Sequence, residues 1–155
     1  MLWSNVLLAY DCSPAALKAV EYVGQMYAKV EGMKVTVLSI YDKVPSTDLG
    51  DSISSPRLME GILALERGKE KGRLVLEEAK KQLVRMGLDE TRITLKYIEK
   101  KKSVAKQIID EAKEGGYGTV VLGRRGESNL KHMLFGSVSG SVVSNLTGAS
   151  IVVVE

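Results

Sequence analysis

The sequence has very little cysteine and histidine, and both shortages limit the chemistry that it can support. Cys12 is the only cysteine among 155 residues, so no disulfide can form within the chain, which agrees with a reducing compartment. His132 is the only histidine, and no other histidine or cysteine stands at metal-ligand spacing from it. We therefore predict no metal site, and we interpret His132 as a surface residue.

Long hydrophobic runs and a strong excess of one charge are also missing. No apolar run approaches the ~20 residues that span a bilayer, and Met1 to Trp3 lacks the features of a signal peptide. The 22 basic and 19 acidic residues leave a net charge of +3, which is too small by itself to indicate nucleic-acid binding. The lysine run 100–102 lacks interleaved aromatic residues and fits a solvated loop. We expect a cytoplasmic protein that binds neither nucleic acid nor a membrane.

Short apolar runs alternate with segments of helical periodicity along the chain. The apolar runs predict strands at 6–10, 34–41, 92–98, 119–122 and 150–154. Apolar residues three and four apart, together with the expected N-caps Ser13 and Ser103, predict helices at 14–30, 57–86, 103–116 and 136–146. This order predicts one α/β domain over residues 1–155, with a doubly wound, five-stranded parallel sheet and helices on both faces.

Two glycine segments near the C-terminal end have the residue types of a phosphate-binding turn. Gly123 closes the strand at 119–122, and after Gly126 nine residues lead to Gly136, which opens a helix of small residues. Glycine lets backbone amides approach a ligand, and a helix start supplies free N–H groups and the positive end of a dipole. Asp11 also follows a strand, and ligands of such sheets bind where the strands end. We therefore predict an anion site at this edge.

Three segments together resemble the universal stress protein family over essentially the whole chain. They are the first strand with its aspartate (6–13, VLLAYDCS), the second strand followed by Asp42, and the pattern G-x2-G-x9-G-S that ends at Ser137. The resemblance implies a Rossmann-like sheet with strand order 3-2-1-4-5. It also implies membership of the branch of the family that binds ATP.

The resemblance further implies which residues hold the nucleotide. Asp11 would contact the adenosine part, and the backbone of Ile40 would meet the adenine edge. Ala9 would also belong to the nucleotide site. The ribose and phosphate loop and the helix start after it would be formed by Gly123, Arg124, Arg125, Gly126, Gly136, Ser137, Val138 and Ser139.

The resemblance also bears on metal ions and partners. Mg²⁺ would be held largely by the phosphates of ATP and by water, with no metal-ligating or catalytic side chain. The apolar last strand, 150–154, would pair two copies of the chain, because exposed apolar edge strands are usually covered. A further, unidentified protein would respond to the nucleotide.

Several alternatives remain open at this point. Asp11 either contacts the ligand or only caps the first helix; Arg124 and Arg125 either face the phosphates or are solvated. Cys12, where the family often has glycine, is either an inert thiol or a redox sensor. Lys102 to Val104 replaces the Gly-x-Pro often found in the family, and we expect this lysine-rich loop at the adenine-side rim of the pocket.

Three functions fit these observations. The first is a nucleotide-responsive binding module. The second is a slow ATP-hydrolysing enzyme, although the chain has no Walker-type Gly-Lys-Ser/Thr and no general base placed by a motif. The third is a ligand-free interaction module of the same fold.

Overall fold

The predicted alternation of strands and helices is present in the computed structural model, which describes residues 2–42, 56–125 and 135–155. Along the chain the elements are β1 (Leu2–Ala9), α1 (Pro14–Tyr27), β2 (Lys34–Tyr41), α2 (Pro56–Arg85), a short 3-10 turn (Glu90–Arg92), β3 (Ile93–Glu99), α3 (Val104–Glu114), β4 (Tyr117–Gly123), α4 (Ser137–Asn145) and β5 (Ser150–Val154). None of the helices in these ranges is both long and apolar enough to cross a membrane.

The five strands form one parallel sheet in the order β3-β2-β1-β4-β5, which confirms the predicted fold class and strand order. β1 lies in the centre, and the chain leaves it first toward β2 and later returns to its other side at β4. Ligands of open α/β sheets bind at the carboxyl ends of strands where the order reverses in this way. The topology alone therefore points to the ends of β1, β2 and β4.

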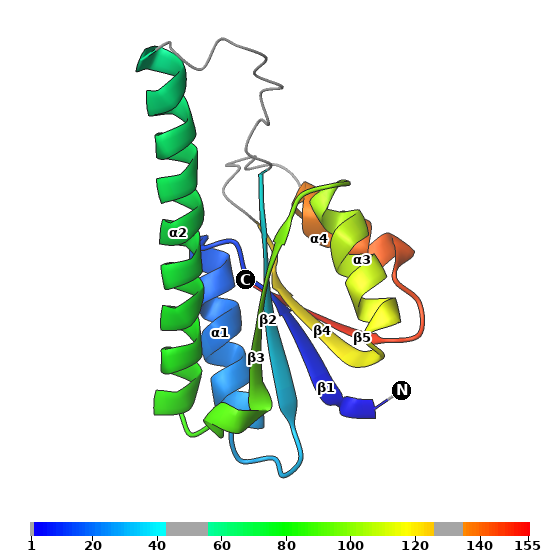
Figure 1. The fold of residues 1–155 in the computed structure, drawn as a ribbon. Helices are drawn as coiled ribbons and strands as arrows, with labels where there is room; N and C mark the ends of the chain where they lie inside the picture. Colours follow the sequence, from blue (N-terminus) through cyan, green and yellow to red (C-terminus); the bar gives the residue numbers. More distant parts are fainter. Residues whose placement is uncertain (1, 43–55, 126–134) are drawn as a thin grey trace.

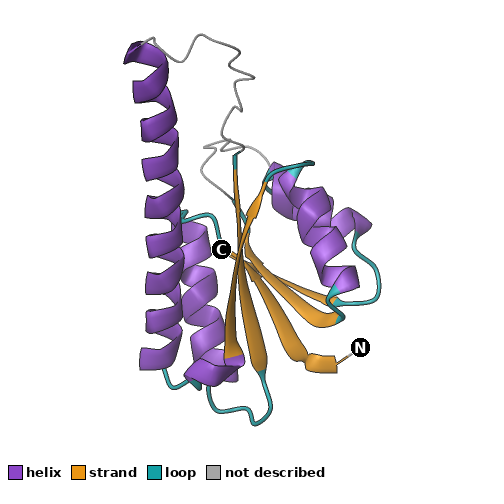
Figure 2. Ribbon diagram, viewed as in Figure 1, coloured by secondary structure: helices purple, strands orange, loops and turns teal. Residues whose placement is uncertain are grey.

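Helices cover both faces of the sheet, as Figures 1 and 2 show, with α1 and α2 on one face and α3 and α4 on the other. Alternate residues of β1 point to opposite faces, as expected for a strand. Val6, Leu8 and Tyr10 join the core under α1 and α2. Leu7 joins the core under α3 and α4, with Ala9 packed against it. β1 is therefore buried on both faces, which explains why its sequence is a continuous apolar run.

Local sequence signals explain where the helices begin. The Ser13 hydroxyl accepts a hydrogen bond from the Ala16 amide at 3.1 Å, and the Ser103 hydroxyl accepts one from the Lys106 amide at 3.3 Å. Both predicted N-caps are thereby confirmed. Each cap satisfies an amide that has no partner within its own helix.

Several predicted boundaries were wrong by one to four residues. α1 ends at Tyr27 rather than near residue 30, because the chain turns there and Gly32 takes a left-handed φ of 79°. β1 begins at Leu2 and β4 at Tyr117, earlier than the apolar runs indicated, because these two residues pair across the sheet. β1 also ends one residue early, at Ala9.

Candidate nucleotide-binding pocket

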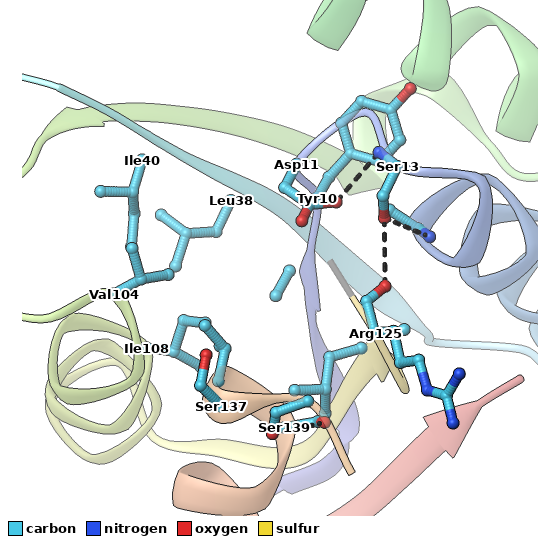
Figure 3. A pocket seen from close by; sticks show the side chains of 16 residues that line it. Tyr10, Asp11, Ser13, Leu38, Ile40, Val104, Ile108, Arg125, Ser137 and Ser139 are labelled. Carbon is cyan, nitrogen blue, oxygen red and sulfur yellow. Dashed lines mark hydrogen bonds between the residues drawn. The ribbon is translucent and has the colours of Figure 1, made fainter. Parts of the chain in front are cut away.

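A cavity of about 230 Å³ opens at the carboxyl ends of β1, β2 and β4, on the face covered by α3 and α4 (Figure 3). It is lined by Ala9, Tyr10, Asp11, Ser13, Ala16, Leu38, Ile40, Val104, Ile108, Leu122, Gly123, Arg125, Gly136, Ser137, Val138 and Ser139. The structure thus brings together nine of the predicted site residues, which come from separate parts of the chain. Arg124 does not line the cavity, and Gly126 lies outside the described residues.

One side of the cavity is an apolar slot. Leu38 and Ile40 come from β2, Val104 and Ile108 come from α3, and Figure 3 shows these four side chains grouped on one side. Leu38 and Ile108 are buried, at 1 % and 2 % exposure. These side chains carry no hydrogen-bonding atom, so the slot suits a flat, weakly polar group that is held by contact and by backbone groups.

The lysine-rich loop does not form the rim of this slot as we expected. The Nζ atom of Lys100 lies 3.3 Å from Oδ1 of Asp42, and the Nζ atom of Lys102 lies 2.9 Å from Oδ2 of Asp110. The side-chain oxygen of Gln107 accepts hydrogen bonds from the backbone amides of Lys101 and Lys102, at 2.8 and 3.1 Å. Lys100 and Lys102 therefore pair with acidic side chains outside the cavity. Of residues 100–104, only Val104 lines the cavity.

Asp11 lies at the mouth of the cavity, directly after β1. Its Oδ1 atom accepts a hydrogen bond from the Ser13 amide at 3.0 Å, and the residue is otherwise exposed. This tight turn is typical of aspartate. The N-cap of α1 is Ser13 rather than Asp11, so the capping role considered above belongs to the serine. The second carboxylate oxygen of Asp11 can accept a hydrogen bond from a ligand.

The start of α4 forms a second part of the cavity wall, and Figure 3 shows Ser137 beside Ile108 of the slot. Gly136 is the N-cap and offers no side-chain cap, so the helix itself leaves the amides of its first turn, Ser137 to Ser139, without partners. The Gly136 amide donates to the Arg124 carbonyl at 2.9 Å, and the buried Ser139 hydroxyl donates to the same carbonyl. The Ser139 hydroxyl proton is therefore already used, while the amides and the helix dipole favour an anion here.

Gly123 and Gly136, two of the three glycines of the pattern, let backbone segments pack closely against each other. We had expected them to let backbone amides approach a ligand. A Cβ at Gly123 would lie 2.7 Å from the Cβ of Ala15 and 2.8 Å from its carbonyl carbon. A Cβ at Gly136 would lie 2.9 Å from the Arg124 carbonyl oxygen. The missing side chains let β4 pack on α1 and let α4 pack on the loop after β4. Both glycines line the cavity, so this close packing helps to set its shape.

The two arginines differ in where their side chains go. Arg124 pairs with Glu155, with 2.7 Å between Nη2 and Oε1, and its side chain is 26 % exposed. Arg125 lines the cavity, and its carbonyl lies 3.5 Å from the Ser13 hydroxyl. Of the two, only Arg125 borders the cavity, and Figure 3 shows its guanidinium extending away from the apolar slot.

Tyr10 and Cys12 lie on either side of Asp11, where the site meets the face of the sheet that α1 and α2 cover. The Tyr10 ring belongs to the core under α1 and α2, so only its backbone side meets the cavity. Burial, and secondarily the neighbouring Cys12, raises the pKa of Tyr10 to about 12. Cys12 is exposed and has a φ of 65°, which is uncommon for a residue other than glycine. This explains why glycine suits that position.

Sequence reasoning missed seven lining residues. Leu38 precedes Ile40 by two positions in the same strand, so it points to the same face. Val104 and Ile108 lie one helical turn apart in α3, and this spacing could have identified them. Tyr10, Ser13, Ala16 and Leu122 reach the cavity only because β1, α1 and β4 converge there, and no sequence signal shows this.

Comparison with known proteins identifies relatives across the whole chain. The Universal stress protein family matches residues 3–154. The universal stress protein YxiE of Bacillus subtilis (strain 168) is 28 % identical over 156 residues, which cover 99 % of this chain and all of that protein.

Two solved structures are similar in fold over the whole length. One is a universal stress protein in complex with cAMP, with a TM-score of 0.70, 19 % identity and coverage of 100 % of this chain and 98 % of that one. The other is a universal stress protein from Archaeoglobus fulgidus in complex with dAMP, with a TM-score of 0.64, 17 % identity and full coverage of both chains.

Proposed function

The chain belongs to the universal stress protein family, and we propose that it binds an adenine nucleotide, ATP in the first place, as a nucleotide-responsive module. One observation carries the proposal. A single cavity is lined by an apolar slot, by the start of α4 and by the exposed Asp11. Two relatives of the same fold were solved with cAMP and with dAMP, which supports an adenine nucleotide for this chain.

Each part of the ligand would meet a matching part of the cavity. The adenine ring would enter the slot between Ile40 and Ile108, with its edge toward the β2 backbone. Asp11 would accept hydrogen bonds from ribose hydroxyls. The phosphates would lie at the first-turn amides of α4, with Arg125 adding a charge-assisted bond.

Binding rather than hydrolysis is the function that the lining residues favour. Among the described residues that line the cavity, Asp11 is the only carboxylate, and it sits where the ribose would bind. Within the described ranges, no group of three or more His, Cys, Asp or Glu side chains could hold a metal ion. Mg²⁺ would therefore be carried by the phosphates and water, and ATP turnover would be slow at most.

The protein would act in the cytoplasm, as a homodimer joined through β5. The described sheet pairs β5 on one side only, with β4, and Ile151 to Val154 are partly exposed. A second copy pairing along this edge would cover apolar groups. Nucleotide binding would then change a surface that another protein reads, provided that the ligand prefers one of two conformations.

Calorimetry with ATP, ADP and AMP, each with and without Mg²⁺, tests the proposal, and mass spectrometry of ligand released from the purified protein identifies what it carries. The informative variant is Asp11→Asn, because asparagine can keep the acceptor for the Ser13 amide but loses the charge. We expect affinity for the nucleotide to fall about tenfold, the cost of losing a hydrogen bond to a charged group.

Asp89→Asn is the matched control. Asp89 forms the same kind of turn, accepting the Thr91 amide at 2.9 Å, and it does not line the cavity. We expect wild-type affinity for this variant. Absence of binding at millimolar ATP with Mg²⁺ would rule out the proposal. An equal loss of affinity in both variants would show that Asp11 does not contact the nucleotide.

A further inference from the structure

Arg124 connects the start of α4 to the end of β5. Its amide donates to the Val154 carbonyl at 2.6 Å, and its guanidinium pairs with Glu155 at 2.7 Å. Its carbonyl accepts the Gly136 amide at 2.9 Å and also accepts the Ser139 hydroxyl. One residue therefore holds the N-cap of α4 on one side and the C-terminal end of the sheet's last strand on the other.

The carbonyl of Arg124 fixes where the first turn of α4 lies. The Gly136 amide precedes the hydrogen bonds within the helix, and its acceptor is this carbonyl. The Gly136 backbone also packs tightly on the loop, since a Cβ there would lie 3.3 Å from the Cα of Arg125. A small rotation of the Arg124 peptide would move the amides of Ser137 and Val138.

The side chain of Arg124 restrains that rotation. Its amide is fixed by Val154 and its guanidinium by Glu155, so the residue is held at two points outside the cavity. The buried Nε atom makes no hydrogen bond within the described residues, so the guanidinium is held there by its pair with Glu155. Arg124 does not line the cavity, so it has no contact with a bound ligand from this position.

We infer that Arg124, through its pair with Glu155, is a positioning residue that holds the start of α4 in its phosphate-binding geometry. The inference rests on the proposed function, because it assumes that the phosphates bind at the start of α4. A direct contact with the phosphates would need the Arg124 side chain alone, whereas a positioning role also needs Glu155. Loss of the side chain weakens the phosphate-dependent part of binding through geometry, and loss of Glu155, which is 73 % exposed, does the same.

The test compares Arg124→Gln, Arg124→Lys, Glu155→Gln and the Arg124→Gln/Glu155→Gln double variant with the wild type. Calorimetry gives the Kd for ATP and for adenosine, which lacks the phosphates. We expect Arg124→Gln to weaken ATP binding roughly fivefold, the upper range for a partly exposed ion pair, and to leave adenosine binding unchanged. Glu155→Gln has a similar effect, the double variant is no worse than Arg124→Gln, and Arg124→Lys recovers part of the loss.

Amide hydrogen exchange supplies a readout that needs no ligand. We expect the Gly136 amide to exchange several times faster in Arg124→Gln than in the wild type, because its acceptor is less firmly held. Arg85→Gln is the matched control, since Arg85 pairs with Glu78 at 3.2 Å on the exposed side of α2 and lies outside the cavity. This variant should change neither affinity nor exchange at Gly136.

The outcomes separate the two proposals. Equal loss of ATP and adenosine binding, additive effects in the double variant, or unchanged exchange at Gly136 would each overturn the positioning role. If the wild type binds no nucleotide, the proposed function fails. The exchange measurement alone then decides whether Arg124 holds the start of α4.

Discussion

Replacing Gly123 with alanine is expected to destabilise the fold because β4 and α1 touch at this residue. The new Cβ would lie 2.7 Å from the Cβ of Ala15, and 2.8 and 3.0 Å from its carbonyl carbon and oxygen. Carbon atoms pack at about 3.5–4.0 Å, so the helix and the strand would have to separate by about 1 Å. Gly123 does not have a positive φ, so the cost is steric.

Overpacking of this kind costs roughly 1–3 kcal/mol, which corresponds to a fall in Tm of roughly 2–12 °C for a chain of this size. Thermal unfolding measures it, and calorimetry on the same samples should show weaker nucleotide binding, because the displaced end of α1 carries Ser13. Gly68→Ala is the control. A Cβ at Gly68 meets nothing within 4 Å, so alanine in this helix should stabilise by about 0.5–1 kcal/mol.

A second substitution tests the cause. Ala15→Gly in the Gly123→Ala background removes the contact between the two Cβ atoms but keeps the contacts with the Ala15 backbone. It should therefore restore only part of the lost stability. If Gly123→Ala unfolds at the wild-type temperature, β4 and α1 are not in the close contact described above, and our explanation of this glycine is wrong.

Two further predictions concern the neighbours of Asp11. Ser13→Ala removes the cap on the Ala16 amide and should lower the free energy of unfolding in urea by about 1 kcal/mol; no change would show that another group caps α1. Burial raises the pKa of Tyr10 from 10.0 to about 12, so the folded state favours the neutral phenol. That contribution is complete below pH 10 and is lost between pH 10 and about pH 12. Tyr10→Phe should therefore lose less stability than the wild type across this window, and parallel stability curves would contradict the assignment.

Most of the fold could be predicted from the sequence because its signals are local and agree with one another. The run at 34–41 became β2 over the same residues, and Ser103 caps α3 as its hydroxyl suggested. The errors lie at the ends of the elements, where pairing between strands determines which residue begins a strand. Leu2 and Tyr117 are strand residues because each supplies hydrogen-bonding groups to the other's strand, and neither residue's own sequence context indicates this.

The site was predicted less completely, because side-chain direction depends on neighbours distant in sequence. Both Arg124 and Arg125 follow β4, and the sequence does not distinguish them. Arg124 turns away because Glu155 lies at the end of the adjacent strand β5. Lys100 and Lys102 leave the cavity rim for the same kind of reason, since Asp42 and Asp110 lie within ion-pair distance. Charge pairing across elements therefore accounts for where the side chains of Arg124, Lys100 and Lys102 lie.

The two ends of the cavity differ in what builds them, and this determines how their variants should behave. The end at α4 is formed by backbone groups that glycines bring together: a Cβ at Gly136 would lie 2.9 Å from the Arg124 carbonyl oxygen. The end at Ile40 and Ile108 is formed by side chains on β2 and α3. If the proposed nucleotide binds, we therefore expect substitutions at the α4 end to act through geometry and to change stability together with phosphate binding. Substitutions in the slot act through the shape offered to the base, so they should separate one nucleotide base from another while phosphate recognition stays the same.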